Sequence, residues 1–270
     1  MVAEHLRDVR PRTAFLSSPQ QFQLFARKAI IEFPPKQQSA DSLGEVEADD
    51  NCLYYVKGDA HGRSVRASEW ICTQIAEAIG IAAPAPAVIE LQDGSTVFGS
   101  RRIAGVADAA ITTAYLTSSS ASNAGIPAQG LKSLLSKIYA LDMFLNNTDR
   151  HLGNYLSVDD NGVRRLYAFD FSRALFWEWP WVGYPSADVH TRTWGSVLRR
   201  LHGFDIVAAN STISGLGALA PAAVEGFINQ MPEDWISIGQ RSQFMAAWTD
   251  GAFQVRLDGL RKGFTDGSLL

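Results

Sequence analysis

A short run of acidic and amide residues near the middle of the chain restricts its fold and chemistry most. Residues 147–156 read Asn-Thr-Asp-Arg-His-Leu-Gly-Asn-Tyr-Leu, and residues 167–172 read Tyr-Ala-Phe-Asp-Phe-Ser. Asp149 and Asn154 are close enough to share one tight loop, and Asp170 follows 16 residues after Asn154. Phosphoryl transfer needs one carboxylate to orient a hydroxyl and oxygen ligands to hold Mg²⁺ against phosphates. These three side chains match that demand.

The segment between Asn154 and Asp170 predicts a β-hairpin. Two apolar stretches, 155–158 and 166–169, predict strands, and the Asn-Gly pair at 161–162 is a strong signal for a tight turn between them. The hairpin would bring Asn154 close to Asp170. Taken alone, the pattern also fits an ordinary hairpin with polar ends, because Asp, Asn and Gly are common turn residues.

A lysine and a glutamate upstream supply a structural context for the motif. The predicted strand Leu53–Lys57 ends in the lysine, and Glu69 follows 12 residues later in a predicted helix, 64–79, that Gly80 would end. Such a pair can hold the lysine ammonium against the α- and β-phosphates of a nucleotide. Two solvated charges are the alternative, but their position ahead of Asp149 favours a pair.

Residues 29–175 resemble the HipA-like kinase family, in a short form without the additional amino-terminal subdomain of its larger members. The Asp-Arg-His-x-x-Asn pattern is also shared with the phosphoinositide kinases. The segments that carry the resemblance are 53–57, 67–84, 98–103, 140–156 and 166–175. The resemblance implies an α+β, bilobal, protein-kinase-like fold. An antiparallel-sheet amino lobe would span residues 1–103, and a mainly helical carboxyl lobe residues 104–270.

The same resemblance implies ATP and Mg²⁺ as cofactors and gives each site residue a role. Lys57 would bind phosphate with Glu69 as its partner, and Asp149 would be the catalytic carboxylate. Asn154 and Asp170 would be the metal ligands. The spacing of these residues leads to the same roles.

Two departures from the kinase pattern concern the phosphate site. Ser172 stands where many protein kinases have the glycine of Asp-Phe-Gly, and no Gly-x-Gly-x-x-Gly precedes the lysine. The candidate phosphate cover is the loop 34–44, whose backbone N–H groups could face phosphate, although most such loops are only solvated connections. Because a serine of this loop is autophosphorylated in some HipA-like kinases, Ser39 and Ser42 are candidates for that role.

The predicted hinge between the lobes follows the strand 96–100. Arg101 and Arg102 lie there, where adenine would contact the backbone. Farther along, the predicted helix 131–145 places Asp142 on its apolar face, which is costly unless its oxygens are paired. We therefore expect Asp142 to accept hydrogen bonds from the loop 147–154. Arg150 and His151 are expected to brace that loop near Phe169 rather than take part in chemistry.

The carboxyl-terminal third is predicted from apolar periodicity. Helices are expected at 193–201, 221–230 and 237–260, and a small polar stretch, 117–130, is expected to be a mobile loop. The aromatic segment 177–184 could line a substrate groove, but buried packing is the more common role of tryptophan.

Composition excludes some partners and favours others. A net charge of −4 and a pI near 5.7 give no basic footprint for nucleic acid. No stretch approaches the roughly 18 apolar residues that span a bilayer, and the amino terminus lacks signal-peptide features, so a cytoplasmic location is expected.

By family analogy we expect a serine/threonine protein kinase with a protein substrate. It could be the toxin of a toxin–antitoxin pair, with an antitoxin or other regulatory partner. The alternatives are a small-molecule or lipid kinase, and a pseudokinase that acts as a binding module.

Overall fold

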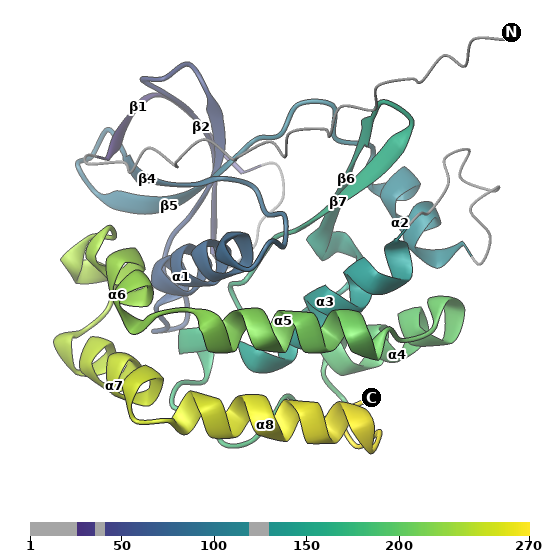
Figure 1. Cartoon of the computed structure of the whole chain (residues 1–270). Helices are drawn as coiled ribbons and strands as arrows, with labels where there is room; N and C mark the ends of the chain where they lie inside the picture. Colours follow the sequence, from purple (N-terminus) through teal and green to yellow (C-terminus); the bar gives the residue numbers. More distant parts are fainter. Residues whose placement is uncertain (1–25, 36–40, 119–129) are drawn as a thin grey trace, which may run out of the picture.

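The computed structural model describes residues 26–35, 41–118 and 130–270. Five strands near the amino terminus form a small closed barrel in the order β1-β2-β3-β5-β4 (Figure 1). Their bounds are β1 (Arg27–Phe33), β2 (Ser42–Ala48), β3 (Leu53–Lys57), β4 (Pro86–Glu90) and β5 (Thr96–Arg101). The predicted α+β class is confirmed.

Four strand pairings of the barrel are antiparallel, as predicted, but the fifth is parallel. β1 pairs with β4 at Arg27–Ile89 and Lys28–Glu90, and this short parallel contact closes the barrel. The prediction of an antiparallel sheet therefore missed the closure. Alternate residues of β2 and β3 face inward, as the period of two requires. The interior holds Val46, Ala48, Tyr54, Val56, Ala87, Ile89 and Val97.

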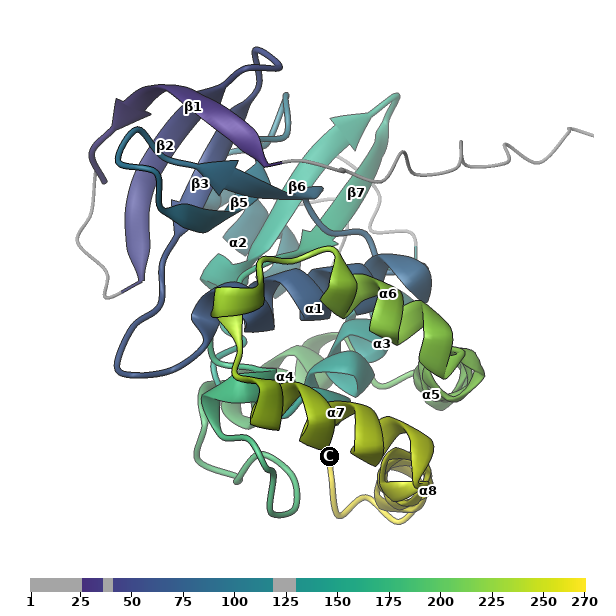
Figure 2. The same cartoon turned by 90° about the vertical axis from the view of Figure 1, so that its left-hand side faces the viewer.

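Helix α1 (Val65–Ala78) follows β3 and matches the predicted helix to within one residue at each end. Eleven of its 14 residues are buried, including the charged Glu69. The helix is enclosed because it lies between the barrel and the helical part of the chain (Figures 1 and 2). Trp70 donates a hydrogen bond from its indole nitrogen to the carbonyl of Phe227, 2.8 Å away in α6 (Pro221–Asn229). A buried carboxylate here must find partners, because desolvating it alone is costly.

The predicted hairpin is present as β6 (Tyr155–Asp160) and β7 (Val163–Ala168). Asn161 and Gly162 form its two-residue turn, and both have positive φ, 54° and 80°, which explains the Asn-Gly pair. The chain that leaves β5 also contacts this hairpin. The Ala107 N–H donates to the Ser157 carbonyl at 2.8 Å, so the link between the barrel and the helices runs along β6.

Most of the other α-helices lie on the opposite side of α1 from the barrel (Figure 2). They are α3 (Leu131–Phe144), α4 (His190–His202), α5 (Ile206–Ala218), α7 (Ile238–Thr249) and α8 (Ala252–Thr265). Helix α2 (Ala109–Thr117) instead lies beside β6 (Figure 1). Short 3₁₀ turns are η2 (Leu152–Asn154), η3 (Leu175–Trp177) and η4 (Glu233–Trp235).

The predicted helices 131–145 and 221–230 match α3 and α6 except for one extra residue at the carboxyl end, but the prediction for the last segment was wrong. One helix was predicted over 237–260, whereas α7 and α8 are separate. Gly251 lies between them. Its φ of +88° is a left-handed backbone conformation that other residues rarely adopt. The α5 helix was not predicted. Most of the expected mobile loop, 119–129, lies outside the described residues.

Two tryptophans of the aromatic segment pack rather than line a groove. Trp179 and Trp181 lie against the ring of Phe253, with centroids 6.0 and 5.7 Å away, and the Trp181 indole nitrogen donates to the Leu175 carbonyl at 2.9 Å. Trp177 differs, because the Arg173 guanidinium stacks 3.6 Å above its ring. The contacts of Trp179 and Trp181 therefore support buried packing.

Within the described part of the chain, no single helix has the length and apolar character needed to cross a bilayer. The pair α5 and α6 passes that test only jointly, and its two members are bent by 78° at the break.

Candidate active site

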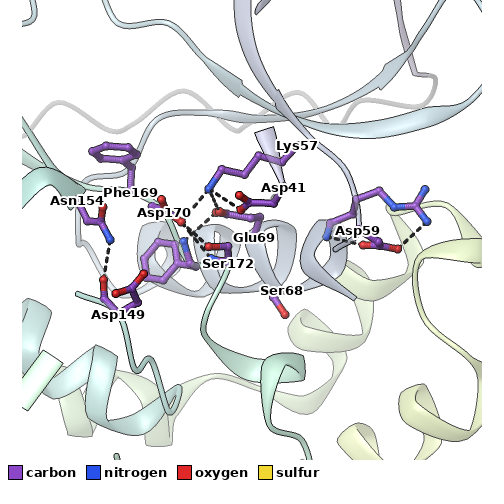
Figure 3. A network of polar contacts seen from close by, with 12 residues as sticks. Asp41, Lys57, Asp59, Ser68, Glu69, Asp149, Asn154, Phe169, Asp170 and Ser172 are labelled. Carbon is purple, nitrogen blue, oxygen red and sulfur yellow. Dashed lines mark hydrogen bonds and ion pairs between the residues drawn. The ribbon is translucent and has the colours of Figure 1, made fainter. Parts of the chain in front are cut away.

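Lys57 joins the barrel to the helical part of the protein. Its Nζ lies 2.6 Å from Glu69 Oε1 on α1 and 2.7 Å from Asp170 Oδ1, just beyond β7 (Figure 3). The lysine is available for both because it is the last residue of β3, where the strand leaves the barrel. Residues separated by 113 positions thus meet at one ammonium group.

The strong pairing shifts the pKa values of these groups. Burial alone would lower the pKa of Lys57, but the carboxylates of Glu69 and Asp170 outweigh it and raise the pKa above its usual range. Burial alone would raise the pKa of Asp170, yet the Lys57 ammonium and two hydrogen bonds from Ser172 hold it well below its usual value. For Glu69, burial dominates and raises the pKa. Lys57 and Asp170 are therefore charged at neutral pH.

The backbone at Asp170 has an unusual conformation that aims its carboxylate at Lys57. Its φ is +62°, a left-handed value that Asp tolerates better than most residues. The Ser172 hydroxyl donates to Asp170 Oδ1 at 2.7 Å, and the Phe171 N–H donates to Glu69 Oε2 at 3.0 Å. Ser172, a departure from Asp-Phe-Gly, thus holds the neighbouring carboxylate.

Asn154 and Asp149 lie together at the other side of Asp170 (Figure 3). The Asn154 side-chain nitrogen donates to the Asp149 carbonyl at 2.7 Å, so the amide oxygen points away from that bond. The Asp149 N–H donates to Asn147 Oδ1 at 3.1 Å. The loop is therefore held by its own amide side chains, as the short Asp149–Asn154 spacing predicts.

A buried ion pair between Arg150 and Asp142 of α3 holds this loop in place. Both oxygens of Asp142 accept hydrogen bonds from Arg150, each at 2.9 Å, and Asn147 Nδ2 donates to Asp142 Oδ1 at 2.8 Å. The expected hydrogen bonds from the loop to Asp142 are present. Arg150 also donates to the carbonyls of Asn154 and Phe169, which ties the loop to the strand end before Asp170.

A contact that the sequence does not suggest lies beside Asp149. His190, the first residue of α4, places Nδ1 at 2.5 Å from Asp149 Oδ1. The next residue, Thr191, donates to the Asn147 carbonyl at 2.6 Å and accepts from the Arg150 N–H at 2.9 Å. The start of α4 is therefore attached to the loop on both sides of Asp149.

Comparison with known proteins agrees with this geometry. The family model for HipA-like kinases matches residues 45–259, which include every residue of the Lys57 and Asp149 clusters described above. The chain belongs to the HipA-like kinase family. The resemblance first carried by residues 29–175 is confirmed and extends into α8.

Two solved structures share the fold of this HipA-like kinase. The Helicobacter pylori proinflammatory kinase CtkA is 14% identical, with a TM-score of 0.56 over 87% of this chain and 96% of its own. HipA of Shewanella oneidensis, solved with HipB and operator DNA, is 10% identical, with a TM-score of 0.50 over 93% of this chain and 76% of its own. No curated protein matches. At these identities the likeness concerns the fold alone.

The phosphate-side predictions for the HipA-like kinase have mixed outcomes. Ser39 lies outside the described residues. Ser42 begins β2 and pairs in register with Lys57, so it lies beside the lysine. Sequence reasoning missed Asp41, whose Oδ2 is 3.6 Å from Lys57 Nζ and for which turn-like neighbours gave no distinct signal.

The remaining predictions concern the hinge and His151. Arg101 ends β5, and the Arg102 N–H donates to the Leu53 carbonyl at 2.7 Å, while its side chain is 53% exposed. The structure places both arginines at the exit from the barrel, as expected. His151 braces the loop, as expected, but not at Phe169. Its Nδ1 accepts from the Gly153 N–H at 3.0 Å, because the imidazole caps the short turn η2 rather than reaching Phe169.

The residues present fit a divalent cation with oxygen ligands. Three carboxylates, of Asp41, Glu69 and Asp170, surround one ammonium, so an excess of negative charge remains. The Asn154 amide oxygen is directed away from its bond to Asp149. Mg²⁺ needs only one or two such protein oxygens, because phosphate and water complete its shell.

Proposed function

We propose that this HipA-like kinase transfers the γ-phosphoryl group of ATP to a serine or threonine hydroxyl of a protein, with Mg²⁺ as the metal. The observation that carries the proposal is the Lys57 ammonium bridging Glu69 on α1 and Asp170 beyond β7. This bridge joins the phosphate-binding lysine to a metal-binding carboxylate, and it is the arrangement that kinases require for activity.

Each residue has a defined task in this proposal. Lys57 contacts the α- and β-phosphates, and Glu69 keeps its ammonium in place. Asp170 and the amide oxygen of Asn154 hold the metal, which when bound neutralises charge on the phosphates. Asp149 orients the incoming hydroxyl and accepts its proton. We also propose the division into lobes at residues 1–103 and 104–270, with adenine against the backbone near Arg101 and Arg102 and with Ser39 and Ser42 in the phosphate cover.

The choice of a protein acceptor rests on family analogy. Its test is incubation with γ-labelled ATP and Mg²⁺, followed by mass spectrometry of the chain and of a cell lysate. The Asp149→Ala and Asp170→Asn variants are the matched controls. Label on serine or threonine that disappears in both variants supports the proposal, since loss of a positioned proton acceptor typically slows transfer about 10²- to 10⁴-fold.

Other outcomes separate the alternatives. Label in the lipid or small-molecule fraction, with none on protein, contradicts the protein acceptor and leaves a kinase of another specificity. Nucleotide binding without transfer to any acceptor identifies a pseudokinase. Wild-type turnover in Asp149→Ala removes the proposed role of that carboxylate.

We further propose a partner of the antitoxin kind. The support is the likeness in fold to a HipA that was solved with HipB and its operator DNA. Induced expression should slow bacterial growth, and the Asp149→Ala variant should not. Equal growth with both proteins would contradict a toxin role without affecting the kinase proposal.

A further inference from the structure

His190 and Asp149 are 41 residues apart, yet their side chains meet. His190 Nδ1 lies 2.5 Å from Asp149 Oδ1. An ionised carboxylate can only accept, so Nδ1 carries the proton and donates. The imidazole is 61% exposed and the carboxylate 36%, so burial alone does not force the two groups together.

The backbone that carries His190 is fixed by its neighbour. Thr191 is 1% exposed and donates from its hydroxyl to the Asn147 carbonyl at 2.6 Å. The same hydroxyl accepts from the Arg150 N–H at 2.9 Å, and the Thr191 N–H donates to the Thr148 carbonyl at 3.4 Å. The first turn of α4 is therefore attached to the residues on either side of Asp149.

The imidazole also has a neighbour on its other side. The ring of His151 lies edge-to-face with that of His190, with centroids 5.9 Å apart and planes at 84°. His151 is itself held by the Gly153 N–H. The His190 ring thus has a carboxylate on one side and a fixed ring on the other, which restricts its rotation.

We infer that His190 is a positioning residue for Asp149. By donating from Nδ1 to Oδ1, it selects one orientation of the carboxylate and leaves Oδ2 as the oxygen that receives the proton of the incoming hydroxyl. The inference rests on the proposed function, in which Asp149 orients that hydroxyl. Because a misplacement of about 1 Å can cost about 10²-fold in rate, loss of the bond should lower kcat roughly 10- to 100-fold.

Three substitutions separate positioning from a structural role. His190→Ala removes the donor. His190→Asn keeps an N–H donor the same number of bonds from Cα as Nδ1, whereas His190→Gln places it one bond farther out. Arg200→Ala, at an exposed position of the same helix, is the control. Steady-state ADP release registers transfer to any acceptor, including water, and its dependence on Mg-ATP concentration up to saturation gives kcat and the KM for ATP.

The expected result is a lower kcat in His190→Ala and His190→Gln, recovery of most of kcat in His190→Asn, and an unchanged KM for ATP in all three. Unfolding temperatures should stay at the wild-type value, since the side chain is mostly exposed. Wild-type kcat in His190→Ala, or a His190→Asn as slow as His190→Ala, overturns the inference. Asp149→Ala distinguishes the two proposals: if it turns over at the wild-type rate, the proposed function fails, whereas a slow Asp149→Ala with a normal His190→Ala defeats only the positioning role.

Discussion

Asp142 and Arg150 form a two-point ion pair with almost no exposure to solvent. Nε and Nη2 of the arginine each lie 2.9 Å from one of the two carboxylate oxygens. The side chain of Arg150 is 3% exposed and that of Asp142 is 0% exposed. Such parallel bonds fix direction as well as distance. The pair joins α3 to the loop that carries Asp149, so the position of that loop depends on this buried contact with the helix.

Breaking this pair from either side should destabilise the protein strongly. Asp142→Ala or Arg150→Ala leaves one charge buried without a partner, which typically costs about 3–5 kcal/mol. Urea unfolding followed by circular dichroism measures the loss. The exposed Arg165–Asp160 pair is the matched control, and Arg165→Ala should cost at most about 1 kcal/mol. An equal, small loss of unfolding free energy in both cases would show that the buried pair contributes no more to stability than the exposed pair.

The contribution of Asp170 to stability should disappear in acid. Its pKa is lowered in the folded protein by Lys57 and Ser172, so its stabilisation is fully present above the unfolded value of about 3.9 and is lost as the pH falls toward the lower folded value. The free energy of unfolding should be compared for wild type and Asp170→Asn between pH 6 and pH 3. The advantage of the wild type should be constant above about pH 5 and shrink below about pH 4. A difference that grows as the pH falls would contradict the lowered pKa.

Nucleotide binding should stabilise the protein in a metal-dependent manner. At Mg-ATP concentrations about 100-fold above Kd, the gain is about 2.7 kcal/mol, or roughly 5–10 °C in Tm for a chain of this size. Thermal unfolding with ATP should show this shift with Mg²⁺ and a smaller one with EDTA. In Asp170→Asn the two shifts should become equal.

Lys57→Met should abolish the shift under both conditions, because the contact with phosphate is lost. Lys132→Met, an exposed position on α3, should behave as wild type. A Mg²⁺-dependent shift that survives in Asp170→Asn would remove this residue from the metal site.

The barrel interior should not accept a side chain at Gly99. A Cβ there would lie 2.6 Å from Ile89 Cγ1 and 3.3 Å from Tyr54 Cδ1. Overpacking of this kind typically costs about 1–3 kcal/mol, so Gly99→Ala should lower the free energy of unfolding by that amount. Gly226→Ala in α6, where a Cβ meets nothing within 4 Å, should instead stabilise by about 0.5–1 kcal/mol. Opposite signs in urea unfolding are expected, and a neutral Gly99→Ala would show that the barrel can expand.

Local patterns predicted much of the site. The strand that ends at Lys57, the helix that carries Glu69 and the hairpin before Asp170 all follow from periodicity and turn residues, and each lies where it was expected. Asp142 was identified because an acid on an apolar helix face requires partners. The boundary between α7 and α8 was missed although Gly251, which has a positive φ, is a local signal for a break in a helix.

The motif around Asp149, Asn154 and Asp170 and the lysine at a strand end carried the resemblance to the family and indicated the proposed chemistry. Such features depend on neighbours in the chain. Only the folded structure showed the parallel β1–β4 contact that closes the barrel, the carboxylate of Asp41 beside Lys57 and the imidazole of His190 beside Asp149. The contacts between β1 and β4 and between His190 and Asp149 join segments more than 40 residues apart. Asp41 is nearer to Lys57 in sequence, yet it reaches the lysine only because β2 and β3 pair in register. Such contacts arise from how the elements pack. The apolar periodicity of a strand or helix predicts that the element forms but not which other element it will contact.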